Sequence, residues 1–141
     1  VDNLKFAAKS LNKKGITLLI EALNTIDVPG FYLTGTDQAV QIISDVSESN
    51  LKLQYDVYHM QIMEGDLIRI ITENIEYIGH FHTAGNPGRN DLDDEQEIYY
   101  PAVMRAIAKT DYDLYVGHEF GPKGDPLAAM QAAYDTCNVT L

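Results

Sequence analysis

Residues that can bind a metal ion or transfer a proton lie at the ends of four short apolar segments of this chain. The segments are residues 16–20, 51–55, 75–81 and 114–117, and the residues at or just beyond their ends are Glu21, Asp56, His82 and Glu119. A helix-like pattern follows each segment, an alternation typical of parallel strands buried on both faces. In such sheets the carboxyl ends of the strands lie at one edge, where ligands bind. We therefore expect the four side chains to share one metal site.

The types of these residues indicate which metal they would bind. Three carboxylates and one imidazole favour hard or borderline cations, namely Mg²⁺, Mn²⁺ or Co²⁺. A closed structural zinc site would need more cysteine or histidine. His80 shares a strand face with His82 but lies farther from the strand end. We therefore expect His80 to pack inside, with a ring nitrogen hydrogen-bonded.

Two of the four residues are glutamates, which bears on the reaction that the site would support. A divalent ion that polarises a carbonyl acidifies the neighbouring C–H bond and stabilises the enediolate left after the proton is removed. Glutamates on opposite faces of that carbon can remove and return the proton. One of them needs a pKa nearer neutrality than a free glutamate has, which a partly dry cavity would supply.

The spacing of apolar and turn-forming residues predicts the elements that position these side chains. Helices are expected over residues 3–12, from Thr36 or Asp37 as a cap to a stop at Asn50, from Gly65-Asp66 to Ile75, from Pro101 to Ile107, and from Pro126 behind an Asp125 cap. Residues 22–35, 57–64 and 84–96 are expected to be loops.

This pattern amounts to four strand–helix units in a single domain, residues 1–141. An eight-stranded (β/α)₈ barrel of the TIM type needs about 250 residues, so four units make half of one. The first helix would then be the tail of a preceding unit. The chain is thus a fragment of a barrel, a half-barrel that pairs with a second copy, or an open four-stranded sheet.

Composition narrows the class of partner. The formal net charge is −11, which repels phosphate backbones and offers no basic face to anionic lipid, so we expect neither nucleic acid nor membrane as a partner. No apolar stretch approaches the ~20 residues that cross a bilayer. The first residues lack the basic-then-apolar order of a signal peptide. A single cysteine, Cys137, fits a reducing cytoplasm.

A series of ordered motifs resembles the C-terminal half, strands 5–8, of the hydroxypyruvate isomerase family within the xylose isomerase-like TIM barrels. The motifs are LIEALN at 19–24, DVPGF at 27–31, QYDVYHMQ at 54–61, EGDL at 64–67, IGHFHTA at 78–84, PGR at 87–89, EIYY at 97–100 and VGHEFGP at 116–122. The resemblance implies that Glu21, Asp56, His82 and Glu119 bind the divalent metal, Mg²⁺ or Mn²⁺ with Co²⁺ as an alternative, and that Glu21 and Glu119 form the acid–base pair.

The resemblance also implies substrate contacts. His59 and Arg89 would hold substrate oxygens, and Glu64 would orient His59 or a hydroxyl. Two features depart from the family pattern: hydroxypyruvate isomerases usually have glutamine at the position of His82, where ketose epimerases have histidine, and residues 90–96 differ from the family's loop. The N-terminal half of the barrel, which supplies the other wall of the active site, is absent from this sequence.

Several functions remain open at this point. The first is an intramolecular oxidoreductase that converts hydroxypyruvate to tartronate semialdehyde, and the second is a ketose 3-epimerase with the same site. A third is an inactive truncated half-barrel that self-associates. The metalloendonuclease that shares this barrel is disfavoured by the charge of −11 and by too few histidines for a multi-zinc cluster. The expected partners are a small-molecule substrate and either a second copy or the missing half-barrel.

Overall fold

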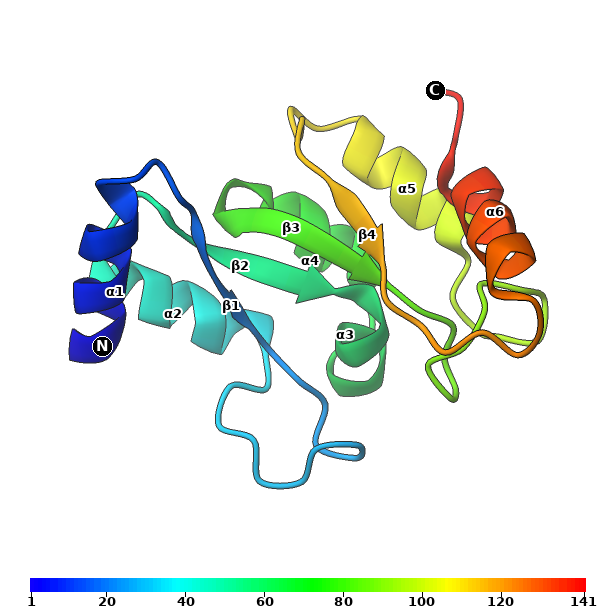
Figure 1. The fold of residues 1–141 in the computed structure, drawn as a ribbon, viewed down its shortest axis with the longest axis horizontal. Helices are drawn as coiled ribbons and strands as arrows, with labels where there is room; N and C mark the ends of the chain where they lie inside the picture. The colour runs from blue at the N-terminus through cyan, green and yellow to red at the C-terminus, as the bar shows by residue number, and fades with distance from the viewer.

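The computed structural model describes every residue from Val1 to Leu141. Four parallel strands form one sheet in the order β1-β2-β3-β4 (Figure 1). Their bounds are Leu18–Glu21 for β1, Leu51–Asp56 for β2, Ile78–Thr83 for β3 and Val116–His118 for β4. All four predicted strands are present. The third begins later than predicted, because Ile75–Tyr77 forms a short 3-10 helix, η1, ahead of it.

Six α-helices accompany the sheet. They are α1 (Asp2–Asn12), α2 (Thr36–Val46), α3 (Val57–Met63), α4 (Leu67–Glu73), α5 (Tyr100–Ala108) and α6 (Pro126–Cys137). The predicted Asp125 cap of α6 is confirmed, since its carboxylate accepts hydrogen bonds from the backbone N–H groups of Leu127 and Ala128 at 2.8 and 3.1 Å. No helix is long and apolar enough to cross a membrane.

The prediction that residues 57–64 form a loop is wrong. They form α3, which starts directly at the end of β2, where the Asp56 carboxylate accepts a hydrogen bond from the backbone N–H of Tyr58 at 2.9 Å. Residues 57–60 are all buried, so the helix has no polar face there, and periodicity could not reveal it. Asp56 therefore has a structural task as an N-cap besides its position at a strand end.

The sheet is covered on one face only. Helices α2, α4 and α5 lie behind the strands in Figure 1, and the opposite face is open. Leu51, Leu53 and Tyr55 of β2 are buried toward the helices, whereas Lys52 and Gln54 between them are only half-buried. The expectation of strands buried on both faces is thus wrong for this chain, which carries one layer of helices and nothing that covers the other side of the sheet.

The cap of α2 also differs from the prediction. Gly35 precedes the helix, and neither Thr36 nor Asp37 caps it with its side chain. The carboxylate of Glu64 does so instead, accepting hydrogen bonds from the Thr36 backbone N–H at 2.6 Å and from the Thr36 hydroxyl at 2.8 Å. A negative charge at this end also complements the helix dipole.

We expect Glu64→Ala to lower the free energy of unfolding by about 1 kcal/mol, the usual cost of losing an N-terminal cap. Chemical denaturation measures this loss. Glu64→Gln keeps an accepting oxygen and should lose less. An unfolding midpoint that does not move in Glu64→Ala would show that water replaces the carboxylate at this helix end.

Candidate metal centre

The structure brings Glu21, Asp56, His82 and Glu119 together at the carboxyl ends of the strands. One potential ligand atom from each residue lies within 4.8 Å of all the others. Glu21 and Asp56 end β1 and β2, and Asp56 is paired in register with His82 of β3. The backbone N–H of Glu119 donates to the carbonyl of Thr83 at 3.0 Å, which continues the pairing beyond β4. The expected convergence is therefore present, while metal binding by these residues stays a prediction.

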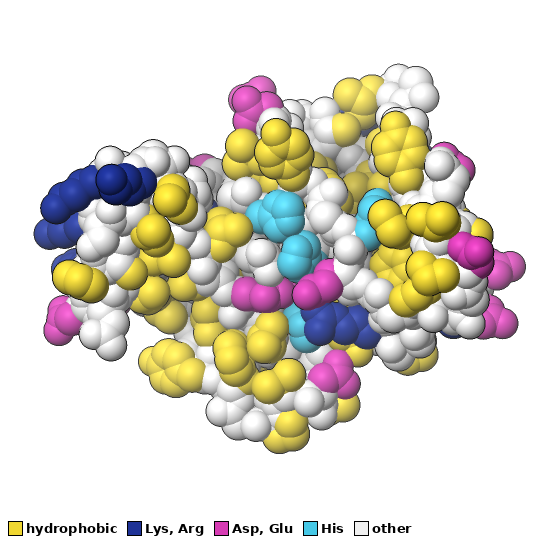
Figure 2. Space-filling model, in the orientation of Figure 1, with side chains coloured by type: hydrophobic (Ala, Val, Ile, Leu, Met, Phe, Trp, Pro, Cys, Tyr) yellow, Lys and Arg dark blue, Asp and Glu magenta, His cyan; other side chains and the backbone are white.

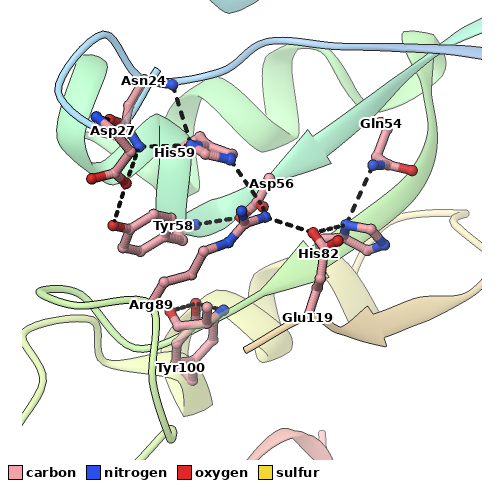
Figure 3. A network of polar contacts seen from close by, with 11 residues as sticks. Asn24, Asp27, Gln54, Asp56, Tyr58, His59, His82, Arg89, Tyr100 and Glu119 are labelled. Atoms are coloured by element: carbon pink, nitrogen blue, oxygen red, sulfur yellow. Dashed lines mark hydrogen bonds and ion pairs between the residues drawn. The ribbon is translucent and has the colours of Figure 1, made fainter. Parts of the chain in front are cut away.

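This cluster occupies the middle of the open face. Figure 2 shows histidine and acidic side chains gathered there, in the orientation of Figure 1. The Asp56 side chain is buried, that of His82 is mostly buried and that of Glu119 is exposed. The His82 Nδ1 lies 3.1 Å from Glu119 Oε2 and 3.3 Å from Gln54 Nε2 (Figure 3). The site is thus reachable from solvent at Glu119 and walled off at Asp56.

Glu21 provides a test of whether a cation fits. Its Oε1 is buried and has no hydrogen-bond partner. Burial raises the pKa of this carboxyl above its ordinary value, and the nearby charges of Asp56 and Glu119 act in the same direction, whereas the Gln54 amide and His82 oppose the rise. A buried carboxylate oxygen without a donor beside two further carboxylates is the environment that a divalent cation would relieve. The donor set therefore fits a hard divalent ion.

Arg89 partly neutralises these carboxylates. Its Nη2 lies 2.6 Å from Glu119 Oε2 and 3.1 Å from Asp56 Oδ2, and its guanidinium lies over the Tyr58 ring, 5.6 Å from the centroid (Figure 3). The loop after β3 delivers it, with Arg89 at a positive φ of 56° and its carbonyl accepting a hydrogen bond from the Gly121 N–H at 2.8 Å. The guanidinium and a metal ion would therefore draw on the same two carboxylates.

We expect Arg89→Gln to bind Mn²⁺ about tenfold more tightly than the unaltered chain, within the range usual for two coupled binding events. The substitution removes a positive charge that competes for Asp56 and Glu119. Titration followed by electron paramagnetic resonance measures the dissociation constant. Arg69→Gln is the matched control, because Arg69 of α4 pairs with Asp66 and Glu73, away from the cluster. Equal affinity in all three proteins would contradict the competition.

A second group of polar residues lies beside the cluster, built on His59 of α3. The His59 ring is buried, and its Nδ1 contacts the side-chain Nδ2 of Asn24 at 2.7 Å. Asn24 also contacts Asp27, whose carboxylate accepts a hydrogen bond from the Tyr58 hydroxyl at 2.6 Å (Figure 3). Burial lowers the pKa of His59, and burial together with the bond to Asp27 raises the pKa of Tyr58 to about 12.

The sequence alone indicated no role for Asn24, Asp27 or Tyr58. Each nevertheless lies in one of the motifs of the resemblance, which was the available signal. A cavity of about 450 Å³ opens beside this group. It is lined by Ile26, Asp27, Tyr58, Ile62, Asn86, Pro87, Gly88 and Arg89. The cavity and the carboxylate cluster share Arg89, so a bound molecule can touch both.

Two predicted neighbours of the site have other surroundings. Both carboxylate oxygens of Glu64 accept hydrogen bonds from Thr36, and the residue that contacts the His59 ring is Asn24. Orientation of a substrate hydroxyl by Glu64 stays a prediction. His80 is half-buried on the open face, and its ring meets that of His82 edge-on at 4.9 Å. The expectation that His80 packs inside with a hydrogen-bonded nitrogen is wrong, because the face to which it points is uncovered.

Comparison with known proteins defines the class of this chain. Residues 1–137 match the family model described as xylose isomerase-like TIM barrel. The chain belongs to this family, and its four strand–helix units form a half-barrel, as the sequence predicted. The resemblance to hydroxypyruvate isomerases is also confirmed by the relatives that follow.

The chain is 47% identical over 131 residues to the hydroxypyruvate isomerase of Escherichia coli, a match that covers 93% of this chain and 50% of the relative. It is 38% identical over 130 residues to the 2-oxo-tetronate isomerase of Cupriavidus necator, covering 92% and 50%. A crystal structure from Brucella melitensis, described as an AP endonuclease of family 2, superposes with a TM-score of 0.90 at 34% identity, covering 95% of this chain and 51% of that one. The chain thus spans about half the length of these relatives.

Proposed function

We propose that this chain is the C-terminal half of a metal-dependent isomerase of the hydroxypyruvate type. The observation that carries the proposal is the cluster of Glu21, Asp56, His82 and Glu119, whose ligand atoms lie within 4.8 Å of one another. The chain that contains this cluster is 47% identical over 131 residues to a hydroxypyruvate isomerase. The four residues would hold Mg²⁺ or Mn²⁺, with Co²⁺ as an alternative.

The proposed reaction moves a proton between adjacent carbons of a hydroxy-keto acid. A bound divalent ion would supply the positive charge that acidifies the carbon-bound hydrogen. Glu21 and Glu119 are the proposed base and acid: one carboxylate takes the proton from the first carbon, and a proton returns to the second. The reaction is balanced when the hydroxyl proton of the first carbon also passes to the oxygen of the second, which leaves the carbonyl on the first carbon. The raised pKa of Glu21 suits it to hold the proton taken from carbon more readily than a free glutamate would.

The remaining polar groups would bind and orient the substrate. The Arg89 guanidinium is a fork of N–H donors beside a cavity, a geometry suited to a substrate carboxylate. The His59 Nε2 is buried without a hydrogen-bond partner and lies 3.7 Å from Asp56 Oδ2, where a substrate oxygen can accept from it. These two contacts favour an acid with neighbouring oxygens over an uncharged sugar.

A ketose 3-epimerase is the second candidate, favoured by His82 in the ligand set. An L-ribulose 3-epimerase shares the fold at a TM-score of 0.82 and 22% identity. A proton that leaves and returns to one carbon would use the same two glutamates. Nuclease activity is disfavoured by the charge of −11 and by the few basic residues on the open face.

The open face of the sheet requires a partner for the site to be closed. We infer that the partner is the N-terminal half-barrel, since the relatives are about twice as long as this chain. Pairing with a second copy is the other arrangement that would cover the sheet. Without either, Glu119 and Arg89 face water, where they interact weakly with a substrate.

A fusion tests the proposal. The N-terminal half of the Escherichia coli relative is joined ahead of this chain, and isomerisation of hydroxypyruvate is followed with and without Mn²⁺. We expect metal-dependent turnover by the fusion and little by the chain alone. Epimerisation of a free ketohexose without action on hydroxypyruvate would favour the second candidate. A fusion that folds and binds no metal would exclude both, and a dimeric chain without turnover would favour the self-associating half-barrel.

A further inference from the structure

The protonation of His59 is determined by the groups around it. His59 is 1% exposed, and Asn24, from the loop after β1, is fully buried. The backbone N–H of Asn24 donates to His59 Nδ1 at 3.2 Å. A backbone N–H cannot accept, so Nδ1 has to be the acceptor and carries no proton. In a neutral imidazole the single proton is then on Nε2.

The side chain of Asn24 enforces the same arrangement. Its Oδ1 accepts hydrogen bonds from the backbone N–H groups of Ile26 and Asp27 at 3.0 and 2.8 Å. These two donors fix which end of the amide is oxygen, and Nδ2 therefore faces His59 Nδ1 at 2.7 Å and Asp27 Oδ2 at 2.9 Å. Turning the amide would place its oxygen against a carboxylate and its NH₂ against two N–H donors. The Asn24 side-chain NH₂ is thus a second donor to His59 Nδ1, besides the backbone N–H of Asn24.

The other ring nitrogen points where no protein group satisfies it. His59 Nε2 is buried, has no hydrogen-bond partner and lies 3.7 Å from Asp56 Oδ2, beyond hydrogen-bond length. A buried donor without an acceptor is costly, so such a group is expected to find its partner in a ligand. Its position next to Asp56 places that ligand atom beside the carboxylate cluster (Figure 3).

We propose that Asn24 is a positioning residue that fixes His59 in the Nε2–H tautomer, so that this N–H donates to a substrate oxygen beside Asp56. The inference rests on the proposed function, which supplies the substrate. His59 is then a neutral donor that stabilises negative charge developing on oxygen and keeps its own proton. The ligand class follows, because the atom facing Nε2 has to be an acceptor, such as a carbonyl or hydroxyl oxygen, and an ammonium group is rejected.

The tautomer can be measured directly in the metal-free chain. The chain has four histidines, so nitrogen NMR of the rings gives few signals, and His59→Gln assigns those of His59 by their loss. We expect Nε2 protonated and Nδ1 unprotonated at neutral pH. A dominant Nδ1–H tautomer, or a charged ring, would overturn the inference whatever the chain binds. This measurement uses the unaltered Asn24, so it does not depend on whether a variant of Asn24 folds.

Asn24→Asp is the second arm, and exposed Asn12→Asp is its matched control. In Asn24→Asp the backbone N–H still faces Nδ1 at 3.2 Å, but a charged acceptor replaces the closer amide donor at 2.7 Å, so Nδ1 should gain a proton in Asn24→Asp alone. In the fusion described above, kcat should fall about 100-fold with a smaller change in KM, since a catalytic histidine in the wrong tautomer costs up to ~10⁴. An unchanged Nδ1 signal or an unchanged kcat would refute the role of Asn24. Mn²⁺ binding to the unaltered chain is measured on the same samples, and its absence would contradict the proposed function while the tautomer result stands.

Discussion

Glu21→Gln should reduce turnover by the completed barrel at least 1,000-fold at saturating metal. The amide cannot accept or return a proton, and general acid–base catalysis alone contributes about 10² to 10⁴ in rate. Glu21 is also a proposed metal ligand, so the substitution would weaken metal binding as well. The rates of the variant and of the unaltered protein therefore have to be compared with metal at saturation. Isomerisation of hydroxypyruvate by the fused chain measures the effect. Glu48→Gln is the control and should leave the rate unchanged, because Glu48 follows α2 and pairs with Lys9.

The same substitution should make the metal-free chain more stable. The folded-state pKa of Glu21 is raised, chiefly by burial, so the fold favours the protonated, neutral carboxyl. Its contribution to stability is fully present below the unfolded pKa and is lost as the pH rises through the raised folded value. The amide of the variant would mimic the neutral form at every pH. We expect the Tm of Glu21→Gln at pH 7 to lie about 2 °C higher, with the difference shrinking toward pH 4.

Loss of rate with gain of stability would separate a functional carboxylate from a structural one. Glu64, which follows α3 and whose carboxylate caps the start of α2, should lose stability when that cap is removed. If Glu21→Gln instead kept its rate, another group would have to move the proton, and the proposed acid–base pair would be wrong. If it lost stability, the buried Oε1 would have a partner in solution that the structure does not contain.

The convergence of Glu21, Asp56, His82 and Glu119 could be predicted from sequence, because it follows from topology. Parallel strands joined by helices end at one edge of the sheet, so residues at successive strand ends meet whatever the details of the loops. The strand register adds to the effect of topology, because it places Asp56 directly beside His82 in the β2–β3 pair. Alternating apolar and turn residues were sufficient evidence for both the strands and most of the helices.

Contacts made by loops could not be predicted in this way. Asn24 and His59 are 35 residues apart, and their contact depends on how the loop after β1 folds back over α3. Arg89 reaches Asp56 and Glu119 from a backbone conformation with positive φ, which is uncommon for a residue other than glycine. The open face has a different origin. A strand's sequence indicates which faces suit burial, but it does not indicate whether a second layer covers them.

Asp56→Asn should weaken Mn²⁺ binding at least 100-fold while leaving the fold intact. Residues that merely orient a ligand cost 10- to 100-fold in metal affinity when replaced, so loss of a charged ligand should exceed that range. Asp56 is the most buried of the four acidic and histidine side chains, at 1% exposure, where its charge is least screened by solvent. Isothermal titration calorimetry with Mn²⁺ gives the dissociation constants.

The Asp56→Asn variant should keep the structural role of Asp56 as the N-cap of α3. Its side-chain oxygen can still accept the hydrogen bond from the Tyr58 backbone N–H that begins α3, so the free energy of unfolding should change by less than ~1 kcal/mol. Arg89 retains Glu119 as a partner at 2.6 Å, and the guanidinium is not left unpaired. Asp45→Asn, at an exposed position of α2, is the matched control for loss of one negative charge. Equal weakening in both variants would mean that metal binding responds to the overall charge of −11 rather than to a site at the strand ends.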